Sequence, residues 1–144
     1  MMSNHCVYLG LGSNLGNRED NILRAVKKIH ELIGTVECQS ALFDTEPWGF
    51  ASENRFLNAV VRVNTTLSPR QLLETTKKIE KALGRRKKSQ TKNGHVVYHD
   101  RIIDIDILLY DNITVDEPDL KIPHPLMYER DFVMIPLQEV LDRE

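Results

Sequence analysis

Two aspartates, Asp104 and Asp106, stand two positions apart in a strongly apolar stretch. The residues that alternate with them are apolar: Ile103, Ile105, Ile107 and Leu109. Because successive side chains of a β-strand point to opposite faces, the pattern predicts a strand with one apolar face and both carboxylates on the other. Two residues of strand separate the Cα atoms by about 7 Å, so the carboxylates would repel each other without a cation. Mg²⁺ prefers one or two carboxylates together with phosphate oxygens, and we therefore interpret the pair as a magnesium site.

A basic segment comes directly before this pair. Residues 85–101 carry six basic side chains and one acidic one, which leaves a charge of −7 on the rest of a chain whose formal net charge is −2. The segment has neither helical nor strand periodicity, so the sequence predicts an irregular loop. Metal-binding carboxylates beside guanidinium and ammonium groups are the components of a phosphoryl-transfer site. We expect the loop to close over a bound nucleotide.

Two of these features also have simpler interpretations. An Asp-x-Asp pattern by itself is more often the solvated acidic face of an edge strand, and only its position beside the basic segment favours a metal site. The run Gly-Leu-Gly-Ser-Asn at 10–14 has neither the glycine spacing of a dinucleotide-binding fingerprint nor the Gly-Lys-Ser/Thr of a P-loop. We expect a tight turn there.

The order of elements around these residues is predicted to be β-α-β-β-α-β. Strands are expected at 7–11, 36–43, 56–64 and 102–110. Helices are expected after the capping residues Asn17 and Ser68 and are predicted to end at Gly34 and Gly84, and a short third helix is expected after Pro136. This order is that of the ferredoxin-like fold, an α+β fold in which helices pack on one face of an antiparallel sheet.

Composition indicates one domain spanning residues 1–144. Hydrophobic residues make up 41% and charged residues 28%, which excludes a disordered chain. No apolar run approaches the roughly twenty residues of a membrane span, and the near-neutral charge does not indicate a nucleic-acid partner. Cys6 and Cys38 make no disulfide framework and no signal peptide is evident, so we expect a cytoplasmic protein with reduced thiols. Nothing in the sequence demands a second subunit, and we expect a monomer.

Several short segments, taken in order, give a more specific indication of function. They are YLGLGSNL at 8–15, TEPWG at 45–49, FLNA at 56–59, IE and GR at 79–80 and 84–85, RIIDIDI at 101–107, and IPHP and RDF at 122–125 and 130–132. At these spacings they closely resemble one family, the 6-hydroxymethyl-7,8-dihydropterin pyrophosphokinases of folate biosynthesis. The resemblance extends over nearly the whole chain. Members transfer the β,γ-pyrophosphoryl group of ATP to the hydroxymethyl oxygen of the pterin and release AMP.

The resemblance also implies a role for particular residues. Asp104 and Asp106 would hold two Mg²⁺ ions that bridge the triphosphate, and Arg85 and Arg101 would contact the phosphates. Residues around the nucleotide would further include Glu80, Lys87, Ile107, His124 and Arg130. The pterin would contact Thr45, Glu46, Pro47, Trp48, Phe56, Asn58, Asp104 and Phe132. Within that set, Phe56 and Phe132 would supply aromatic walls and the Asn58 amide would bond the ring edge.

The sequence departs from the family pattern at several positions. Members often have Trp-Gly-Pro-Arg ahead of the paired aspartates, whereas this chain has Tyr98-His-Asp-Arg101 and so lacks the loop tryptophan. The basic segment is longer than in many members by the span 89–97. Pro125 stands where a tyrosine that contacts ATP is often found, and Asp119 replaces a common basic residue. These departures concern nucleotide affinity and loop closure rather than the reaction.

Three other classes of protein compete with this interpretation. An RNA-recognition module has the same order of elements, but it presents stacking aromatics and a basic sheet face, where this chain has paired aspartates. Another Mg²⁺-dependent nucleotidyl transferase would also use paired aspartates, but it would not explain Phe56, Asn58 and Phe132. A plain interaction domain has no large apolar stripe to support it.

Overall fold

The central sheet contains the four strands of the predicted order. The computed structural model describes residues 3–46, 55–84, 89–92, 95–98 and 102–143. The strands β1 (His5–Ser13), β2 (Gly34–Gln39), β4 (Phe56–Thr65) and β7 (Asp104–Tyr110) are arranged in the order β2-β4-β1-β7, and the short β3 (Phe43–Thr45) also pairs with β4. All of these pairings are antiparallel. The predicted ferredoxin-like arrangement is therefore confirmed.

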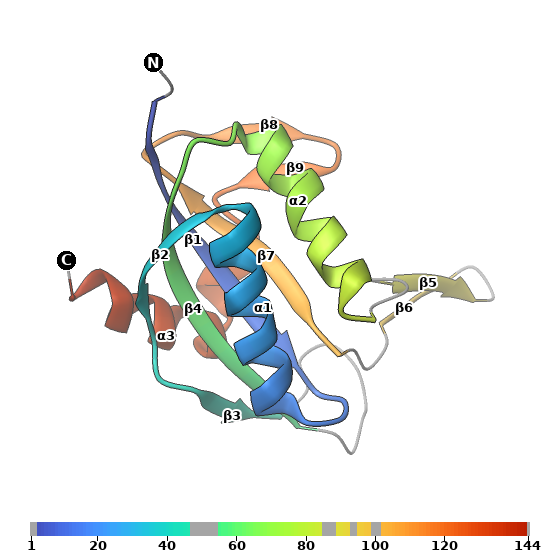
Figure 1. Cartoon of the computed structure of the whole chain (residues 1–144). Helices are drawn as coiled ribbons and strands as arrows, with labels where there is room; N and C mark the ends of the chain where they lie inside the picture. Colours follow the sequence, from blue (N-terminus) through green and yellow to red (C-terminus); the bar gives the residue numbers. More distant parts are fainter. Residues whose placement is uncertain (1–2, 47–54, 85–88, 93–94, 99–101, 144) are drawn as a thin grey trace.

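Two helices cover one face of this sheet, α1 (Arg18–Leu32) and α2 (Pro69–Ala82) (Figure 1). Both begin at the predicted caps. The Asn17 side chain accepts a hydrogen bond from the N–H of Asp20. Ser68 and Gln71 form a reciprocal capping box, in which each side chain accepts the backbone N–H of the other residue. These local bonds fix where each helix starts and therefore which side chains face the sheet.

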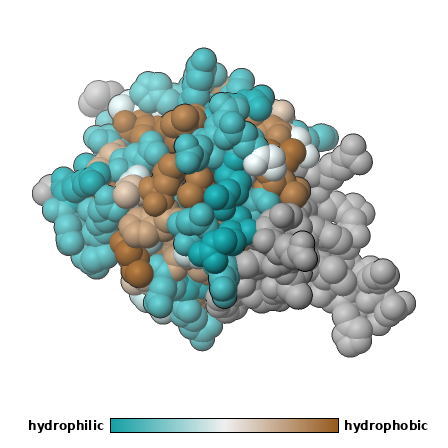
Figure 2. Space-filling model, turned by 90° about the horizontal axis from the view of Figure 1, so that it is seen from below, coloured by the Kyte–Doolittle hydropathy of each residue, from teal (hydrophilic) through white to brown (hydrophobic). Residues whose placement is uncertain are grey.

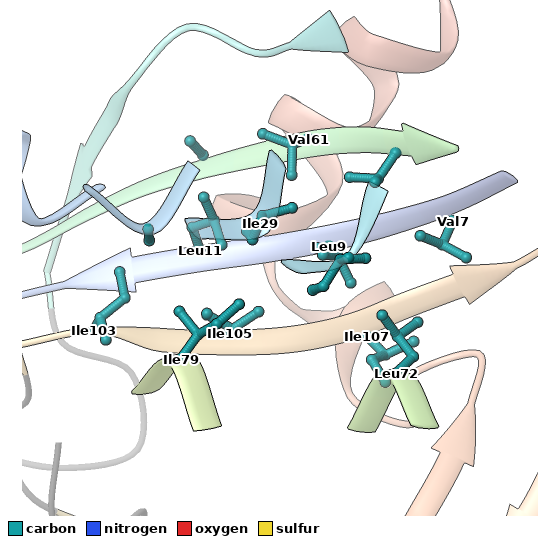
Figure 3. Packing of buried hydrophobic residues seen from close by; sticks show 14 of the residues in the cluster. Val7, Leu9, Leu11, Ile29, Val61, Leu72, Ile79, Ile103, Ile105 and Ile107 are labelled. Carbon is teal, nitrogen blue, oxygen red and sulfur yellow. The ribbon is translucent and has the colours of Figure 1, made fainter. Parts of the chain in front are cut away.

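The main core lies between this helical layer and the sheet. In Figure 3, Ile79 and Leu72 of α2 face Ile105 and Ile107 of β7. Ile29 of α1, the other helix of this layer, packs in the same cluster. The apolar face of β7 predicted from its isoleucines is thus buried against α2.

A second, smaller apolar cluster covers the opposite face of the sheet. Helix α3 (Asp131–Leu141) follows a short 3₁₀ turn (Met127–Glu129) and packs there. The buried members of the cluster are Tyr8, Val60, Leu108, Met127, Val133, Leu137 and Val140. The helix expected after Pro136 in fact begins five residues earlier, with Pro136 inside it. A proline inside a helix removes one hydrogen bond and crowds the carbonyl four residues earlier, and burial of this helix against the sheet offsets that cost.

Strand β7 changes its alternation part-way along. Its register with β1 shifts between Tyr8 and Leu9, which pair with Leu109 and Ile107 and leave Leu108 as the extra residue. Leu109 consequently packs with the α3-side cluster, while Tyr110 joins the main core. The expectation that Leu109 shares a face with the three isoleucines is therefore wrong, because a β-bulge interrupts the period of two.

Two short hairpins lie outside the central sheet. One joins β5 (Ser89–Lys92) to β6 (His95–Tyr98), within the segment predicted to be irregular, and that prediction is wrong for these residues. The other joins β8 (Val115–Glu117) to β9 (Leu120–Ile122). Arg70 at the start of α2 forms ion pairs with Glu117 and Asp119 and so ties this second hairpin to the helix.

The remaining expectations about elements need smaller changes. The strand expected at 36–43 is divided into β2 and β3, and the strand expected at 7–11 continues to Ser13. Over the described part of the chain, no helix combines the length and the apolar character that a membrane crossing would need.

Candidate active site

One row of residues runs across three strands on the face opposite α1 and α2. Gly12 of β1 pairs with Asn58 of β4 on one side and with Asp104 of β7 on the other. Two positions away, Gly10 pairs in the same way with Val60 and Asp106. Directly opposed residues of antiparallel strands share a face, so both aspartates lie on the same face as Asn58.

The two glycines let neighbouring side chains approach the backbone of β1 closely. A Cβ atom added at Gly12 would lie 3.2 Å from Oδ1 of Asn58 and 3.5 Å from a ring carbon of Phe56. At Gly10 the nearest atoms would be the methyl carbons of Leu108, at 3.4 Å. The expected tight turn at 10–14 is therefore wrong for these glycines, which lie inside β1. Glycine within a strand often marks a place where another group approaches the backbone closely.

Asn58 links β4 to the neighbouring β3. Its side chain is 5% exposed, and its Nδ2 donates to Oγ1 of Thr45 at 2.8 Å and to the carbonyl of Phe43 at 3.4 Å. The structure thus brings together Asn58 and Thr45, two of the predicted pterin residues. Glu46, the next residue along, is exposed and lies 3.9 Å from Nη1 of Arg55. Pro47 and Trp48 lie outside the described residues.

An ion cluster fixes β3 beside the start of α1. Asp44 accepts from Nε of Arg55 at 2.8 Å and from Nη2 of Arg18 at 3.2 Å, and Arg18 also donates to the carbonyl of Arg55. Hydrogen bonds from Arg18 and Arg55 hold the pKa of the Asp44 carboxyl below its usual value. The cluster joins residues from three separate segments, and no local sequence pattern indicates it.

His124 lies beside Asp106. Its Nε2 is 4.0 Å from Oδ1 of Asp106, and both side chains are mostly buried. The backbone N–H of His124 donates to the carbonyl of Leu108, and the N–H of Leu126 donates to its Nδ1. The segment after β9 therefore attaches to β7 and brings a predicted nucleotide residue next to a predicted metal ligand.

The start of α3 contributes a cation and an aromatic ring. Cζ of Arg130 lies 5.7 Å from the ring centroid of Phe132, within the range of a cation–π interaction. Both side chains are half-buried, and Phe132 packs against the cluster that contains Val60 and Leu108. Phe132 and Arg130 thus lie on the same face of the sheet as the paired aspartates.

Two predicted nucleotide residues lie on the other face. The side chain of Ile107 is buried in the main core against α2. Glu80 is buried on α2, where its Oε2 accepts the backbone N–H of Ile105 at 2.8 Å. Arg85, Lys87 and Arg101 lie outside the described residues.

Comparison with known proteins decides the family. The family model for 7,8-dihydro-6-hydroxymethylpterin-pyrophosphokinase matches residues 8–142. The chain belongs to this family. The pyrophosphokinase of Porphyromonas gingivalis is 48% identical over 135 residues, covering 93% of this chain and 89% of that protein.

A second relative and a solved structure place this pyrophosphokinase in context. A folic acid synthesis protein of Dictyostelium discoideum is 38% identical over 137 residues, or 95% of this chain, which spans 20% of that longer protein. A crystal structure of HPPK-DHPS in complex with substrates superposes with a TM-score of 0.74. The match covers 96% of this chain and 40% of the HPPK-DHPS chain. At 14% identity, this last likeness bears on the fold alone.

These comparisons confirm the family, the enzyme class and the connection with folate synthesis that the sequence motifs predicted. The RNA-binding module and the other nucleotidyl transferase considered as alternatives are set aside accordingly. The roles of the individual site residues, the number of metal ions and the closure of 85–101 over a nucleotide stay predictions. The structure adds the position of each described site residue, on the strands of the sheet or on the segments that pack against it.

Proposed function

We propose that this chain transfers the β,γ-pyrophosphoryl group of ATP to the hydroxymethyl oxygen of 6-hydroxymethyl-7,8-dihydropterin. A bond forms between that oxygen and the β-phosphorus, the bond from the β-phosphorus to the AMP oxygen breaks, and the hydroxyl proton is lost. AMP and the pterin diphosphate are the products. The observation that carries this proposal is the row Asn58-Gly12-Asp104, which places the proposed pterin-edge residue and a proposed metal ligand on one face of the sheet, one strand apart.

The paired aspartates suit magnesium. Asp104 and Asp106 are half-buried on one face, and the residues opposite them in β1 are glycines. Two carboxylates leave most of an octahedral Mg²⁺ shell for water and phosphate oxygens, the donor set that this ion takes in nucleotide enzymes. Asp104 and Asp106 would together hold two Mg²⁺ ions. When bound, these ions neutralise charge that develops on the phosphates.

The pterin side is built from β3, β4 and the start of α3. The Asn58 amide offers a donor and an acceptor to the edge of the ring. Phe56 and Phe132 supply apolar walls, and Thr45 is held to Asn58 by a hydrogen bond. Glu46, Pro47 and Trp48 continue the same segment and are assigned to the pterin through their backbone.

The nucleotide side surrounds Asp106. His124 and Arg130 are its described polar contributors. Arg85, Lys87 and Arg101 would supply the positive charge that a triphosphate needs, as the concentration of basic residues in 85–101 suggests. For Ile107, whose side chain is in the core, only the backbone is available to the nucleotide.

The chain acts as one pyrophosphokinase domain over residues 1–144, as a monomer, in the cytoplasm, with no nucleic-acid or membrane partner.

One assay tests this function. The protein is incubated with ATP, and the nucleotides are separated by chromatography, with and without Mg²⁺ and the pterin. We expect AMP to form only when both are present. Formation of ADP, or turnover without the pterin, would contradict the proposed function.

A further inference from the structure

The edge strand β7 is held from outside the sheet by hydrogen bonds to its backbone, and one of them lies between the paired aspartates. Strand β7 has β1 on one side and no strand of the described sheet on the other. Backbone donors on such an edge need partners when they are buried. The N–H of Ile105, which lies between Asp104 and Asp106, donates to Oε2 of Glu80 at 2.8 Å.

Helix α2 holds this carboxylate in place. Glu80 is 8% exposed, and its neighbours on the same side of the helix, Ile79 and Thr76, are almost fully buried. In Figure 3, Ile79 lies against Ile105, so the turn of α2 that carries Glu80 is packed onto the middle of β7. Burial of a carboxylate is unfavourable unless the group is hydrogen-bonded, and a bond from a backbone N–H to an ionised oxygen is among the stronger ones.

The consequence concerns the two metal ligands. The peptide unit that contains the Ile105 N–H also contains the carbonyl of Asp104, so the hydrogen bond fixes the plane between Asp104 and Ile105. That plane sets the directions in which the side chains of Asp104 and Asp106 leave the strand. Metal sites bind tightly when their ligands are already held in the productive geometry.

We propose that Glu80 is a positioning residue, which orients Asp104 and Asp106 for metal and nucleotide by fixing the backbone between them. The inference rests on the proposed metal role of the two aspartates. It differs from a direct contact between Glu80 and the nucleotide, because Glu80 acts on the backbone N–H of Ile105.

Two conservative variants separate reach from charge. Glu80→Gln keeps the side-chain length and an oxygen acceptor but removes the charge, whereas Glu80→Asp keeps the charge and shortens the reach by one methylene. Ile79→Val is the matched control, because it loosens the same turn of α2 without touching the acceptor. Thermal unfolding of each variant establishes that it is folded.

The readouts are independent of turnover. In the full chain without ligands, hydrogen exchange at the Ile105 amide should be about tenfold faster in Glu80→Asp than in Glu80→Gln. With Mn²⁺ and a non-hydrolysable ATP analogue, the Mn²⁺ affinity measured by electron paramagnetic resonance should fall about tenfold in Glu80→Asp and less than about threefold in Glu80→Gln. Ile79→Val should match the unaltered chain in Mn²⁺ affinity.

The reverse order, with Glu80→Gln the more impaired, would overturn the proposal in favour of a charge role. Equal losses in all three variants would reduce Glu80 to a general packing residue and would also overturn it. Failure of the proposed function is distinguished by Asp104→Asn. If that variant binds Mn²⁺ normally, the metal assignment is wrong, whereas the exchange of the Ile105 amide still reports on Glu80.

Discussion

Asn58 and Asp104 lie on one face of the sheet, separated only by the backbone of β1 at Gly12. One residue is the predicted partner of the pterin edge, and the other is a predicted ligand of the metal that binds the phosphates. Neighbouring strands are about 4.8 Å apart, so two strand spacings, about 10 Å, separate the two backbones. That distance suits a bicyclic ring whose hydroxymethyl group reaches toward a metal-bound phosphate.

Gly12→Ala should weaken pterin binding. The added Cβ would lie 3.2 Å from Oδ1 of Asn58, so the amide must shift from the ring edge. We expect the KM for the pterin to rise about tenfold, with a smaller change in the KM for ATP. Gly10→Ala adds the same atom next to Leu108 and provides the control. Equal effects of the two substitutions on pterin KM would show that Gly12 has no special relation to Asn58.

Asp104→Asn and Asp106→Asn should each reduce kcat by about 100-fold or more at saturating substrates, because half of the carboxylate charge that holds the metal is lost. Neither should unfold the chain, since both side chains are on the sheet face opposite the main core. Asp116→Asn, on the exposed β8 hairpin, is a charge-matched control. Steady-state rates at varied Mg²⁺ provide the measurement, and wild-type rates at low Mg²⁺ in either variant would refute the metal role.

Phe132→Ala should raise the KM for the pterin more than that for ATP. Loss of an aromatic wall removes both buried area and stacking, which we expect to cost about tenfold or more in pterin affinity. Pterin binding can be followed by fluorescence titration. Tyr128→Ala removes an exposed aromatic ring nearby and should leave the affinity unchanged. A larger effect on ATP than on the pterin would place Phe132 on the nucleotide side.

Asp44 should make stability weakly dependent on pH. Its folded-state pKa is below the ordinary value of 3.8, so its contribution is present above that pH and is lost as the pH falls through the folded-state value. Because Asp44 and Arg55 are about half exposed, the contribution should be less than about 1 kcal/mol. Urea unfolding of Asp44→Asn should show this loss at pH 7 and a smaller difference from the unaltered chain at a pH well below 3.8. A constant difference at both pH values would contradict the ion-pair explanation.

The elements that carry their own local signals could be predicted from the sequence. Asn17 and Ser68 cap their helices through bonds to residues three positions along, and the isoleucines of β7 show their period directly. The hairpin β5–β6 also had such a signal in Asn93-Gly94, a dipeptide typical of two-residue hairpin turns, and it was missed. The β-bulge at Leu108 had none, because it depends on how β7 pairs with β1.

The residues of the candidate site also include some that the sequence could predict and some that it could not. The paired aspartates are two positions apart in the sequence, and their shared face follows from strand geometry alone. The role of Gly12 could not be predicted, because its two partners lie 46 and 92 residues away along the chain. The contact of Glu80 with Ile105 joins a helix to a strand edge across 25 residues. Figure 2 views the molecule from below and shows hydrophobic and hydrophilic areas interspersed on that face.

The hydrogen bond between Glu80 and Ile105 also bears on self-association. An exposed strand edge can pair with the edge of another molecule, and such pairing is a common start of aggregation. At the middle of β7 an incoming strand would have to displace a buried carboxylate from the N–H it needs. The bond that we propose orients Asp104 and Asp106 would therefore also oppose edge-to-edge assembly at the outer edge of the sheet.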